Sequence, residues 1–291
     1  MGINAIHTRT LGSWLQTLGY APSTIYATEH YTSDFLHYLE TLGVTSLEAV
    51  RPAMVDSYHQ HLQTRNSKRS GGSLSNNYIT SNINALKRLA KYLRETGQTT
   101  LEVPIKTVQD KYTTRNILTT GEVRALYQAC GNNTLGIRDR AILGIYYGCG
   151  LRRSEGVSLN VADILLKGKR VHVTSGKGYK ERYVPVTGAV IEDLENYIHT
   201  AREEIQDLKP GKNEALFLSM QARRMCGTTI LERIHKLAHD ANIHKEVGLH
   251  VLRHSIATHL LQSGLTLEEV SQFLGHSSLE STQVYTHVAN E

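Results

Sequence analysis

A polar stretch about a third of the way along the chain separates two parts with different residue patterns. Residues 98–115 contain Pro104 and have no regular spacing of apolar residues, which indicates a linker. Residues 8–96 show apolar residues at helical spacing only. With 291 residues the chain is long enough for two domains. We therefore predict a first domain over residues 1–100, a linker over 101–115 and a second domain over 116–291.

The first domain is predicted to be a small antiparallel bundle of helices. Pro22 begins a helix that Gly43 ends, and Ser46 is expected to cap a third helix. Residues 67–75 are rich in Ser and Gly and indicate a loop. A last helix follows this loop and combines one apolar face with one basic face.

The second domain combines helices with short strands. Residues 137–148 are strongly apolar and predict a helix that is buried all round. Residues 170–174 and 183–186 alternate between apolar and polar side chains, and the glycine-rich residues between them predict a hairpin turn. The predicted fold class is mainly α with a small antiparallel β-sheet.

The sequence lacks the features of membrane and secreted proteins. No apolar run approaches the roughly 20 residues that span a bilayer, and the N-terminus lacks the charged and apolar regions of a signal peptide. The three cysteines are far apart and form no C-x-x-C pair, which predicts reduced thiols and a cytoplasmic location. His250 and His254 have the spacing of zinc ligands, but no glutamate follows the first histidine and no paired cysteines exist. We predict no metal and no cofactor.

Several side chains of the second domain have the chemistry that phosphodiester cleavage requires. This reaction needs a nucleophile, stabilisation of the charge on the phosphorane and an acid for the leaving oxygen. The guanidinium groups of Arg152 and Arg253 can each hold two non-bridging oxygens. Tyr285 can form a covalent phosphoester, and Lys177 in the glycine-rich turn can reach the leaving 5′ oxygen.

The spacing of the remaining candidates supports this chemistry. His250 lies three residues before Arg253 in a predicted helix, so both side chains lie on one face. His276 follows a glycine that is a good helix C-cap residue. Glu155 lies one helical turn after Arg152 and can hold or orient its neighbours.

The distribution of charge favours DNA as the partner. A formal net charge of +5 is weak evidence by itself, and a single basic cluster is most often a solvated helix face. Several such clusters beside a phosphate-handling site shift the interpretation towards nucleic acid. The predicted DNA-binding residues of the first domain are Lys68, Arg69, Lys87, Arg88, Lys91 and Arg94.

The sequence resembles the tyrosine recombinases of the phage integrase family, and the Xer-like bacterial members in particular. The motifs that carry the resemblance are Gly150-Leu151-Arg152-Arg153-Ser154-Glu155, Gly176-Lys177-Gly178-Tyr179-Lys180-Glu181-Arg182, Leu249-His250-Val251-Leu252-Arg253-His254, Leu274-Gly275-His276, and Thr282 followed by Tyr285-Thr286-His287. Each motif is modest alone, whereas their joint order and spacing are very specific. The resemblance covers essentially the whole chain, because the N-terminal bundle resembles the family's SAM-like core-binding domain and the rest its α+β catalytic domain.

The resemblance implies a role for each candidate residue: Tyr285 as nucleophile, Arg152, Arg253 and His276 as contacts of the scissile phosphate, Lys177 as the acid for the 5′ hydroxyl, His250 as an aid to proton transfer, and Glu155 as a supporting residue. It further implies a site-specific recombinase that needs no metal or cofactor and forms a 3′-phosphotyrosyl intermediate and a Holliday junction. The expected partners are double-stranded DNA with inverted half-sites and further copies of the chain, up to a tetramer.

Two other functions remain open at this stage. A type IB topoisomerase shares the phosphotyrosine chemistry, and a DNA-binding protein that has lost catalysis shares the fold. The second would have a replaced tyrosine or arginine, and none is replaced here; the compact bundle and the Xer-like hairpin favour recombination. Integration or excision of a mobile element and chromosome dimer resolution use the same chemistry, with a slight preference here for a mobile-element integrase. The target sequence and any accessory or partner recombinase are not readable.

The sequence ends six residues after Tyr285, at Glu291. Xer-like relatives usually continue into a further helix that packs on a neighbouring protomer, so the chain is expected to be a monomer without DNA and to assemble only weakly on it.

Overall fold

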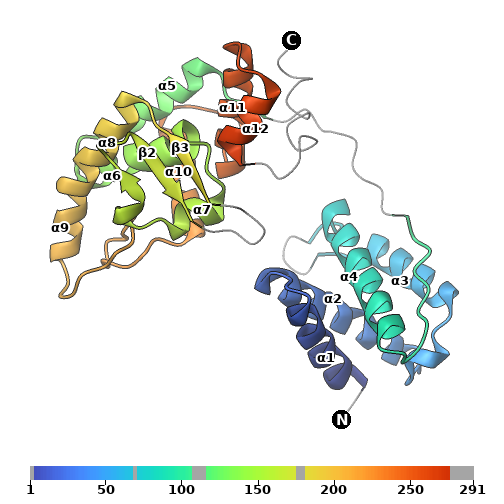
Figure 1. The fold of residues 1–291 in the computed structure, drawn as a ribbon. Coiled ribbons are helices and arrows are strands. Elements are labelled where there is room, and N and C mark those ends of the chain that lie inside the picture. The colour runs from blue at the N-terminus through green and yellow to red at the C-terminus, as the bar shows by residue number, and fades with distance from the viewer. Residues whose placement is uncertain (1–2, 68–70, 107–115, 175–180, 276–291) are drawn as a thin grey trace. The chain divides into compact units, whose positions relative to one another are not determined.

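The computed structural model describes residues 3–67, 71–106, 116–174 and 181–275 (Figure 1). The chain divides into two compact units, Met1–Thr113 and Thr114–Glu291, and this division falls inside the predicted linker. Each unit has its own core of buried apolar side chains. The described residues are mostly helical with one small antiparallel sheet, as predicted. None of their helices is long and apolar enough to cross a bilayer.

The first unit is a bundle of helices. Its elements are α1 (Ile3–Thr17), α2 (Pro22–Thr41), the 3₁₀ turn η1 (Leu47–Ala49), α3 (Pro52–Thr64) and α4 (Asn76–Glu95). Helix α4 contacts α1, α2 and α3, and its apolar face supplies much of the core, with Ile83, Leu86 and Leu89 almost fully buried. The predicted start of α4 is confirmed, because the side chain of Ser75 accepts a hydrogen bond from the Tyr78 amide.

The predicted third helix is wrong in where it begins. Ser46 caps only the three-residue turn η1, through a hydrogen bond from the Glu48 amide of 3.3 Å, and the helix itself begins at Pro52. Proline disfavours helical geometry in the residue before it, and Arg51 is accordingly extended, with a φ of -108° and a ψ of 152°. Proline is well suited to the first turn of a helix, so the break falls where Pro52 stands.

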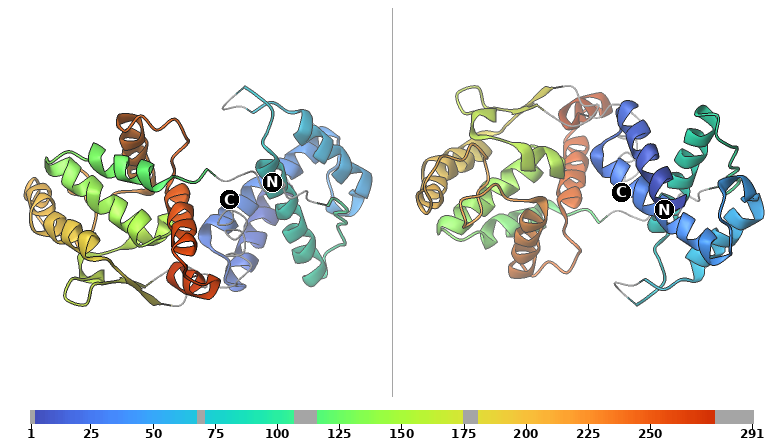
Figure 2. Two further views of the ribbon diagram at one scale, coloured as in Figure 1. Left: turned by 90° about the horizontal axis from the view of Figure 1, so that it is seen from above. Right: turned by 90° about the horizontal axis from the view of Figure 1, so that it is seen from below.

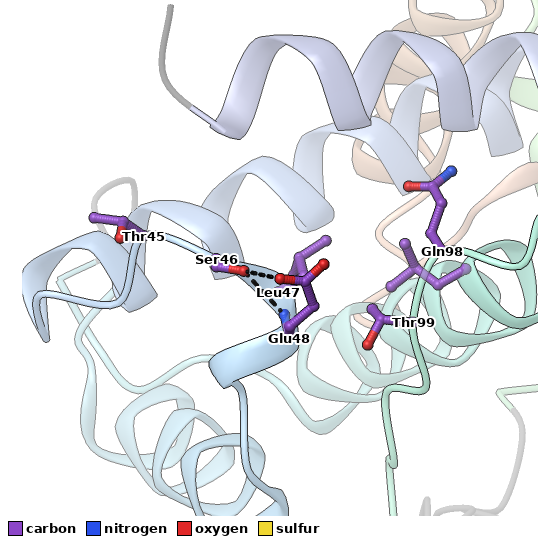
Figure 3. Close-up of a pocket in the computed structure, with 7 residues that line it drawn as sticks. Thr45, Ser46, Leu47, Glu48, Gln98 and Thr99 are labelled. Atoms are coloured by element: carbon purple, nitrogen blue, oxygen red, sulfur yellow. Dashed lines mark hydrogen bonds between the residues drawn. The ribbon is translucent and has the colours of Figure 1, made fainter.

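A pocket of the first unit lies beside this turn (Figure 3). It is lined by Thr45, Ser46, Leu47, Glu48, Leu93, Gln98 and Thr99. The one ionisable side chain of this lining is Glu48, and its Oε2 accepts a hydrogen bond from the Ser46 hydroxyl at 2.9 Å. Because this lining has no basic side chain, the pocket does not suit a DNA phosphate.

The first part of the predicted linker belongs to the first unit. Leu101 is buried in the core of the bundle, and Val103 and Ile105 pack against that core. Leu101, Val103 and Ile105 lie two residues apart, as in a half-buried extended segment, but Pro104 between them counts against a strand, so the sequence pattern indicates a linker.

The second unit contains a sheet among helices. Its elements are α5 (Thr120–Ala129), α6 (Thr134–Leu143), η2 (Gly144–Gly148), α7 (Arg153–Ser158), η3 (Val161–Asp163), β1 (Ile164–Leu165), β2 (Arg170–Val173), β3 (Arg182–Pro185), α8 (Gly188–His199), α9 (Ala201–Asp207), α10 (Gly227–Asp240), α11 (Leu249–Gln262) and α12 (Leu267–Leu274). Figure 2 shows α11 and α12, in the red part of the colour scale, next to each other in both views, and the two helices are in contact.

The sheet has the strand order β1-β2-β3, and both pairings are antiparallel. Strands β2 and β3 confirm the predicted hairpin within one residue at each end, whereas β1 has only two residues and no detectable sequence pattern. In the register of the hairpin Arg170 pairs with Pro185, and Val173 pairs with Arg182. Arg182 therefore stands at the end of the sheet that leads into the glycine-rich turn.

The predicted apolar helix over residues 137–148 changes its geometry part-way. Helix α6 ends at Leu143, and Gly144–Gly148 continues as a π-helix. A Cβ atom on Gly144 would lie 2.9 Å from Val190 Cγ1, and one on Gly148 would lie 2.8 Å from Val190 Cγ2, so both glycines allow α8 to pack closely. Gly150 then has a φ of 60°, which lets the chain turn into α7.

Candidate active site

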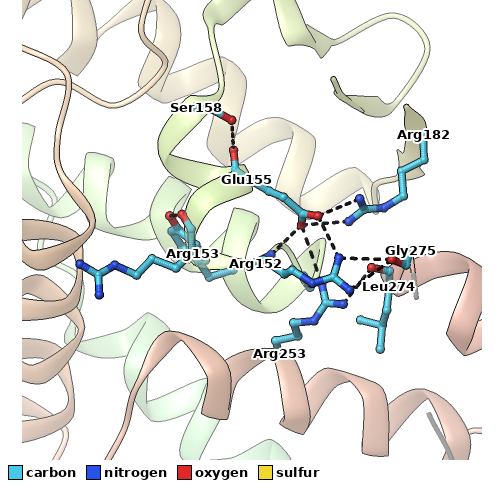
Figure 4. A network of polar contacts seen from close by, with 10 residues as sticks. Arg152, Arg153, Glu155, Ser158, Arg182, Arg253, Leu274 and Gly275 are labelled. Carbon is cyan, nitrogen blue, oxygen red and sulfur yellow. Dashed lines mark hydrogen bonds and ion pairs between the residues drawn. The ribbon is translucent and has the colours of Figure 1, made fainter. Parts of the chain in front are cut away.

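Glu155 is the centre of the polar network that the described residues form in the second unit (Figure 4). It occupies the third position of α7, and Arg152 stands at the N-cap. The Arg152 amide donates to Oε2 of Glu155 at 2.7 Å, and Nη1 of the same arginine donates to Oε1 at 3.0 Å. The carboxylate thus closes the first turn of the helix and holds the arginine side chain at once. The predicted pairing of these two residues is present.

Arg152 also contacts the end of α12. Its Nη1 and Nη2 both donate to the carbonyl oxygen of Gly275 at 3.2 Å. Gly275 ends α12 in the left-handed conformation with a φ of 65°, which glycine adopts without strain. This confirms the predicted C-cap. A cation at the C-terminal carbonyls of a helix is favoured by the helix dipole, so α12 helps to hold Arg152.

Arg253 comes from α11 and is almost fully buried, with 3% of its surface exposed. Its Nη1 donates to the carbonyl of Gly150 at 2.5 Å, and its Nη2 donates to the carbonyl of Leu274 at 2.8 Å. The same Nη1 lies 3.9 Å from Oε2 of Glu155. Arg253 therefore joins the segment before α7 to the end of α12, and it lies beside the carboxylate that holds Arg152.

A third arginine completes the network and was not among the predicted site residues. Arg182 of β3 donates from Nη1 to Oε1 of Glu155 at 3.0 Å and from Nη2 to Oε2 at 3.1 Å, which is a bidentate pair. The only sequence signal for it was its position in the motif after the glycine-rich turn. The neighbouring Arg153 does not belong to the network; its side chain points away from Glu155 (Figure 4) and packs against Gly227.

The charges of this network favour an anion. Burial alone raises the pKa of Glu155, but hydrogen bonds from Arg182 and from the Arg152 amide outweigh it and hold this pKa below its ordinary value. The carboxylate is thus ionised at neutral pH, and three guanidinium groups surround it. One negative charge among three positive charges leaves the cluster with a net charge of +2, which attracts the negative charge of a DNA phosphate.

His250 lies in the first turn of α11, and the residue as a whole is exposed, although its imidazole ring is partly buried. Partial burial of the imidazole lowers its pKa, and the positive charges of Arg253, Arg152 and Arg153 lower it further. The imidazole is therefore neutral at pH 7 and can accept a proton. The rings of His250 and His254 have centroids 6.5 Å apart. The described residues contain no group of three or more metal-ligating side chains, and the predicted absence of a metal stays a prediction.

Three predicted catalytic residues, Lys177, His276 and Tyr285, lie outside the described residues, as do Lys68 and Arg69. The structure thus brings together Arg152, Glu155 and Arg253, and it places His250 on the same helix as Arg253.

The predicted basic face of α4 has three exposed members and one that turns inward. Lys87, Lys91 and Arg94 are exposed along the helix. Arg88 is half-buried, and its guanidinium lies over the ring of Tyr20, 5.9 Å from the centroid. Successive helix positions are about 100° apart, so Arg88 cannot share the stripe that positions 87, 91 and 94 form.

Comparison with known proteins decides the family. Residues 116–291 match the sequence profile of the phage integrase family. The chain belongs to this family. The tyrosine recombinase XerD of Staphylococcus epidermidis is 34% identical over 279 residues, which are 93% of this chain and 90% of that relative. The crystal structure of the XerA recombinase matches 97% of this chain and 92% of that chain, with 26% identity and a TM-score of 0.53.

The XerH site-specific recombinase bound to its difH substrate has the same fold. The match covers 90% of this chain and 76% of that chain, with a TM-score of 0.70 at 24% identity. Membership of the phage integrase family confirms the resemblance read from the sequence motifs. Tyrosine recombinases are enzymes that exchange DNA strands, and the chain is an enzyme of this class.

Proposed function

We propose that this recombinase cuts and rejoins duplex DNA at specific sites through a 3′-phosphotyrosyl bond to Tyr285. The observation that supports this most directly is the pair Arg152 and Arg253, which Glu155 holds side by side at the end of α12. In sequence the next residue after that end is His276, the further proposed phosphate contact.

The proposed reaction is a transesterification that conserves the phosphodiester energy. The phenol oxygen of Tyr285 attacks the phosphorus, its proton passes to a base, and the bond from phosphorus to the 5′ oxygen breaks. His250 is suited to the proton transfer because its lowered pKa keeps it neutral at pH 7. Lys177 supplies the proton that the leaving 5′ oxygen takes up.

The arginines stabilise the charge that builds up on the phosphorane. Each guanidinium offers donors in a fixed plane that matches two non-bridging oxygens. Because Glu155 and the main-chain carbonyls hold Arg152 and Arg253 before DNA arrives, little reorganisation accompanies the reaction. Electrostatic preorganisation of this kind makes a large contribution to the rate enhancement of many enzymes.

Assembly on DNA follows from the need for paired sites. We propose that two protomers bind inverted half-sites, that two such pairs form a tetramer, and that strands exchange through a Holliday junction. The DNA complex of XerH and the dimer of lambda integrase on a core site are precedents for binding and multimers in related folds. The similarity to Xer recombinases favours chromosome dimer resolution over integration of a mobile element.

The exposed side chains of α4 are the proposed phosphate contacts of the first unit, together with Lys68 and Arg69, which precede it in the sequence. Lys87, Lys91 and Arg94 follow one stripe, and one of them, Lys91, also lies 3.8 Å from Glu95. An exposed pair of this kind contributes little, so a DNA phosphate can replace the carboxylate. Contacts of this type determine affinity and its salt dependence rather than sequence preference.

The decisive experiment is detection of the covalent adduct. DNA bound by the purified protein is selected from genomic fragments, and the recovered duplex is then incubated with protein and resolved on a denaturing gel. Tyr285→Phe should abolish the adduct and leave binding within about twofold, because phosphate contacts carry most of the affinity. Tyr26→Phe, at a tyrosine of the first unit that is 72% exposed, is the matched control and should form the adduct normally. An adduct that persists in Tyr285→Phe would contradict the assignment.

Plasmids with zero, one or two copies of the selected site separate recombination from relaxation. A recombinase requires two sites to change the connectivity of the plasmid, whereas a topoisomerase relaxes plasmids whatever the number of sites. Relaxation without any site would favour the topoisomerase function.

A further inference from the structure

Arg182 stands where three segments of the proposed site meet. It begins β3 directly after the glycine-rich turn, its guanidinium forms the bidentate pair with Glu155, and it packs against Gly275 at the end of α12. We propose that Arg182 is a positioning residue of the strand-cleavage site, which holds the Glu155 carboxylate in the orientation that aligns Arg152. This inference rests on the proposed function.

The contacts of Arg182 show that it holds the Glu155 carboxylate. Both terminal nitrogens of the guanidinium donate to the two oxygens of one carboxylate. The opposite side of the group is closed by Gly275, since a Cβ atom there would lie 2.6 Å from Nε and 2.7 Å from Cζ of Arg182. The side chain is only 13% exposed. The two terminal nitrogens are thus engaged by Glu155, whereas Nε is buried beside Gly275 without a hydrogen-bond partner among the described residues.

Glu155 depends on this contact for its orientation. Its side chain has no exposed surface, and it accepts four hydrogen bonds, two from Arg152 and two from Arg182. Without Arg182 each carboxylate oxygen loses one donor, and the side chain can rotate about its last bond. Because Oε1 also receives Nη1 of Arg152, such a rotation displaces the guanidinium that is proposed to hold the phosphate.

The charged groups around Glu155 predict a distinctive pH effect. It is faced by Arg152 at the start of α7, Arg182 from β3 and Arg253 from α11, with Tyr146 of η2 as a further titratable neighbour. Burial raises the pKa of Glu155, and the hydrogen bond from Arg182 is the first of the contacts that lower it. Removal of Arg182 therefore raises this pKa, and the carboxylate becomes neutral at a higher pH than in the wild type. Cleavage should then decline at mildly acidic pH, where the wild type is still active.

The matched control is Arg233, which also forms a bidentate pair with a buried carboxylate in this unit. Its Nε donates to Oδ1 of Asp139 at 3.2 Å and its Nη2 donates to Oδ2 at 2.5 Å, and the Asp139 side chain is 1% exposed. Arg233→Gln removes a pair of the same kind without touching the network of Glu155. Comparison of Arg182→Gln with Arg233→Gln thus separates a general loss of stability from a loss of cleavage rate that is specific to the proposed site.

The test measures single-turnover formation of the covalent adduct, equilibrium DNA binding and thermal unfolding for Arg182→Gln, Arg182→Lys and Arg233→Gln between pH 5 and pH 8. We expect Arg182→Gln to lower the cleavage rate on the order of 100-fold, the loss that a misplacement of about 1 Å produces. DNA binding should stay within about twofold, because phosphate contacts spread over the DNA backbone carry the affinity. The acid limb of the rate profile should move to higher pH. Arg233→Gln should cleave at the wild-type rate once corrected for folded protein.

The variant Arg182→Lys distinguishes a positioning role of Arg182 from a role of its positive charge alone. Lysine keeps the positive charge but cannot form the planar two-point contact, so the cleavage rate of Arg182→Lys should stay far below that of the wild type. A substrate with sulfur at the bridging 5′ position should not rescue Arg182→Gln, because the defect lies in alignment of Arg152 and not in protonation of the leaving group. If Arg182→Gln does not fold, the lysine variant decides the question by the same criteria.

Three results would overturn the inference. A wild-type rate and pH profile in Arg182→Gln would make the residue a stabiliser only. Full recovery in Arg182→Lys would make its role one of charge. Rescue by the sulfur substrate would place its effect on the proton donor. Absence of any adduct in the wild-type protein would instead contradict the proposed function, so the two failures are distinguishable.

Discussion

Replacement of Glu155 by glutamine tests the balance of charge on which the site depends. The amide has nearly the same volume, so packing is preserved, but the negative charge among three guanidinium groups is lost. Four hydrogen bonds reach the carboxylate, and the amide nitrogen that replaces one oxygen is a donor that faces arginine donors. Up to two of the four hydrogen bonds are then broken.

The expected loss of unfolding free energy is about 3–5 kcal/mol, the range for removal of one partner from a buried ion pair. No large discount for solvent applies, because the side chains of Arg152, Arg182 and Arg253 are 19%, 13% and 4% exposed. For a domain of this size each kcal/mol corresponds to about 2–4 °C, so the midpoint should fall by roughly 6–20 °C.

The two units allow a built-in control, since they need not unfold together. Trp14 is the single tryptophan of the chain and lies in α1, where its ring packs edge-on against Tyr92. Tryptophan fluorescence therefore reports on the first unit, and calorimetry reports on both. Glu155→Gln should lower one calorimetric transition and leave the fluorescence midpoint unchanged.

The effect has a defined pH dependence. Because the folded state holds the pKa of Glu155 below its ordinary value, the carboxylate stabilises the protein above the unfolded pKa. The difference between wild type and variant should be constant near neutral pH and should shrink as the pH falls through the lowered pKa of the folded state. A variant that unfolds within about 1 °C of the wild type at pH 7 would refute the idea that this carboxylate balances the arginines.

Three further predictions follow from other parts of the second unit and its proposed chemistry. Cys226 is exposed, and hydrogen bonds with the hydroxyls of Thr228 and Thr229 lower its pKa to about 6, whereas burial raises the pKa of Cys130 and of Cys149 to about 12. Iodoacetamide at pH 7 should therefore label Cys226 alone in the native protein, and intact-mass spectra that show labelling of Cys130 or Cys149 would contradict this. Gly275→Ala should lower the free energy of unfolding by about 1–2 kcal/mol because of the left-handed backbone, and it should also displace Arg182, so the cleavage rate should fall. The control is Gly264→Ala, at a glycine with a φ of 97° and open space around it, which should lower stability and leave the cleavage rate unchanged. Lys177→Ala should slow adduct formation, and a substrate with sulfur at the bridging 5′ position should rescue this variant but not Arg152→Ala; equal rescue of both variants would contradict these roles. EDTA should leave the wild-type cleavage rate unchanged, and a loss of cleavage in EDTA that magnesium restores would contradict the metal-independent mechanism.

Much of this fold was predictable because its boundaries depend on local chemistry. The predicted helix that contains His250 and Arg253 is present as α11, the helix expected after the loop over residues 67–75 begins at Asn76, and Gly275 is the expected C-cap. A cap is a contact between residues three or four positions apart, so its residue type is visible in the sequence. The pairing of Arg152 with Glu155 is a contact of this range as well, and it too was expected.

The remaining features depend on contacts between distant segments. Arg182 reaches Glu155 across 27 positions because the register of β2 and β3 turns its side chain towards α7, and a shift of one residue would turn it away. The π-helix after Leu143 depends on how closely α8 approaches the two glycines. The break before Pro52 was local and could have been read, because proline marks the first turn of a helix more strongly than Ser46 marks its cap.

The arrangement of the arginines bears on where control of strand exchange can lie. Arg152 and Arg253 are held by Glu155, by the carbonyl of Gly150 and by the last carbonyls of α12, all within one unit of one chain. Every protomer has these same residues, so the contacts that hold the pair are available to each of them, and we do not expect the pair by itself to distinguish a protomer that cleaves from one that waits. If strands are exchanged one pair at a time, the difference between protomers must come from groups other than this pair. The nucleophile and the general acid are the candidates, because a change in the position of either stops the reaction while the phosphate-binding arginines stay aligned.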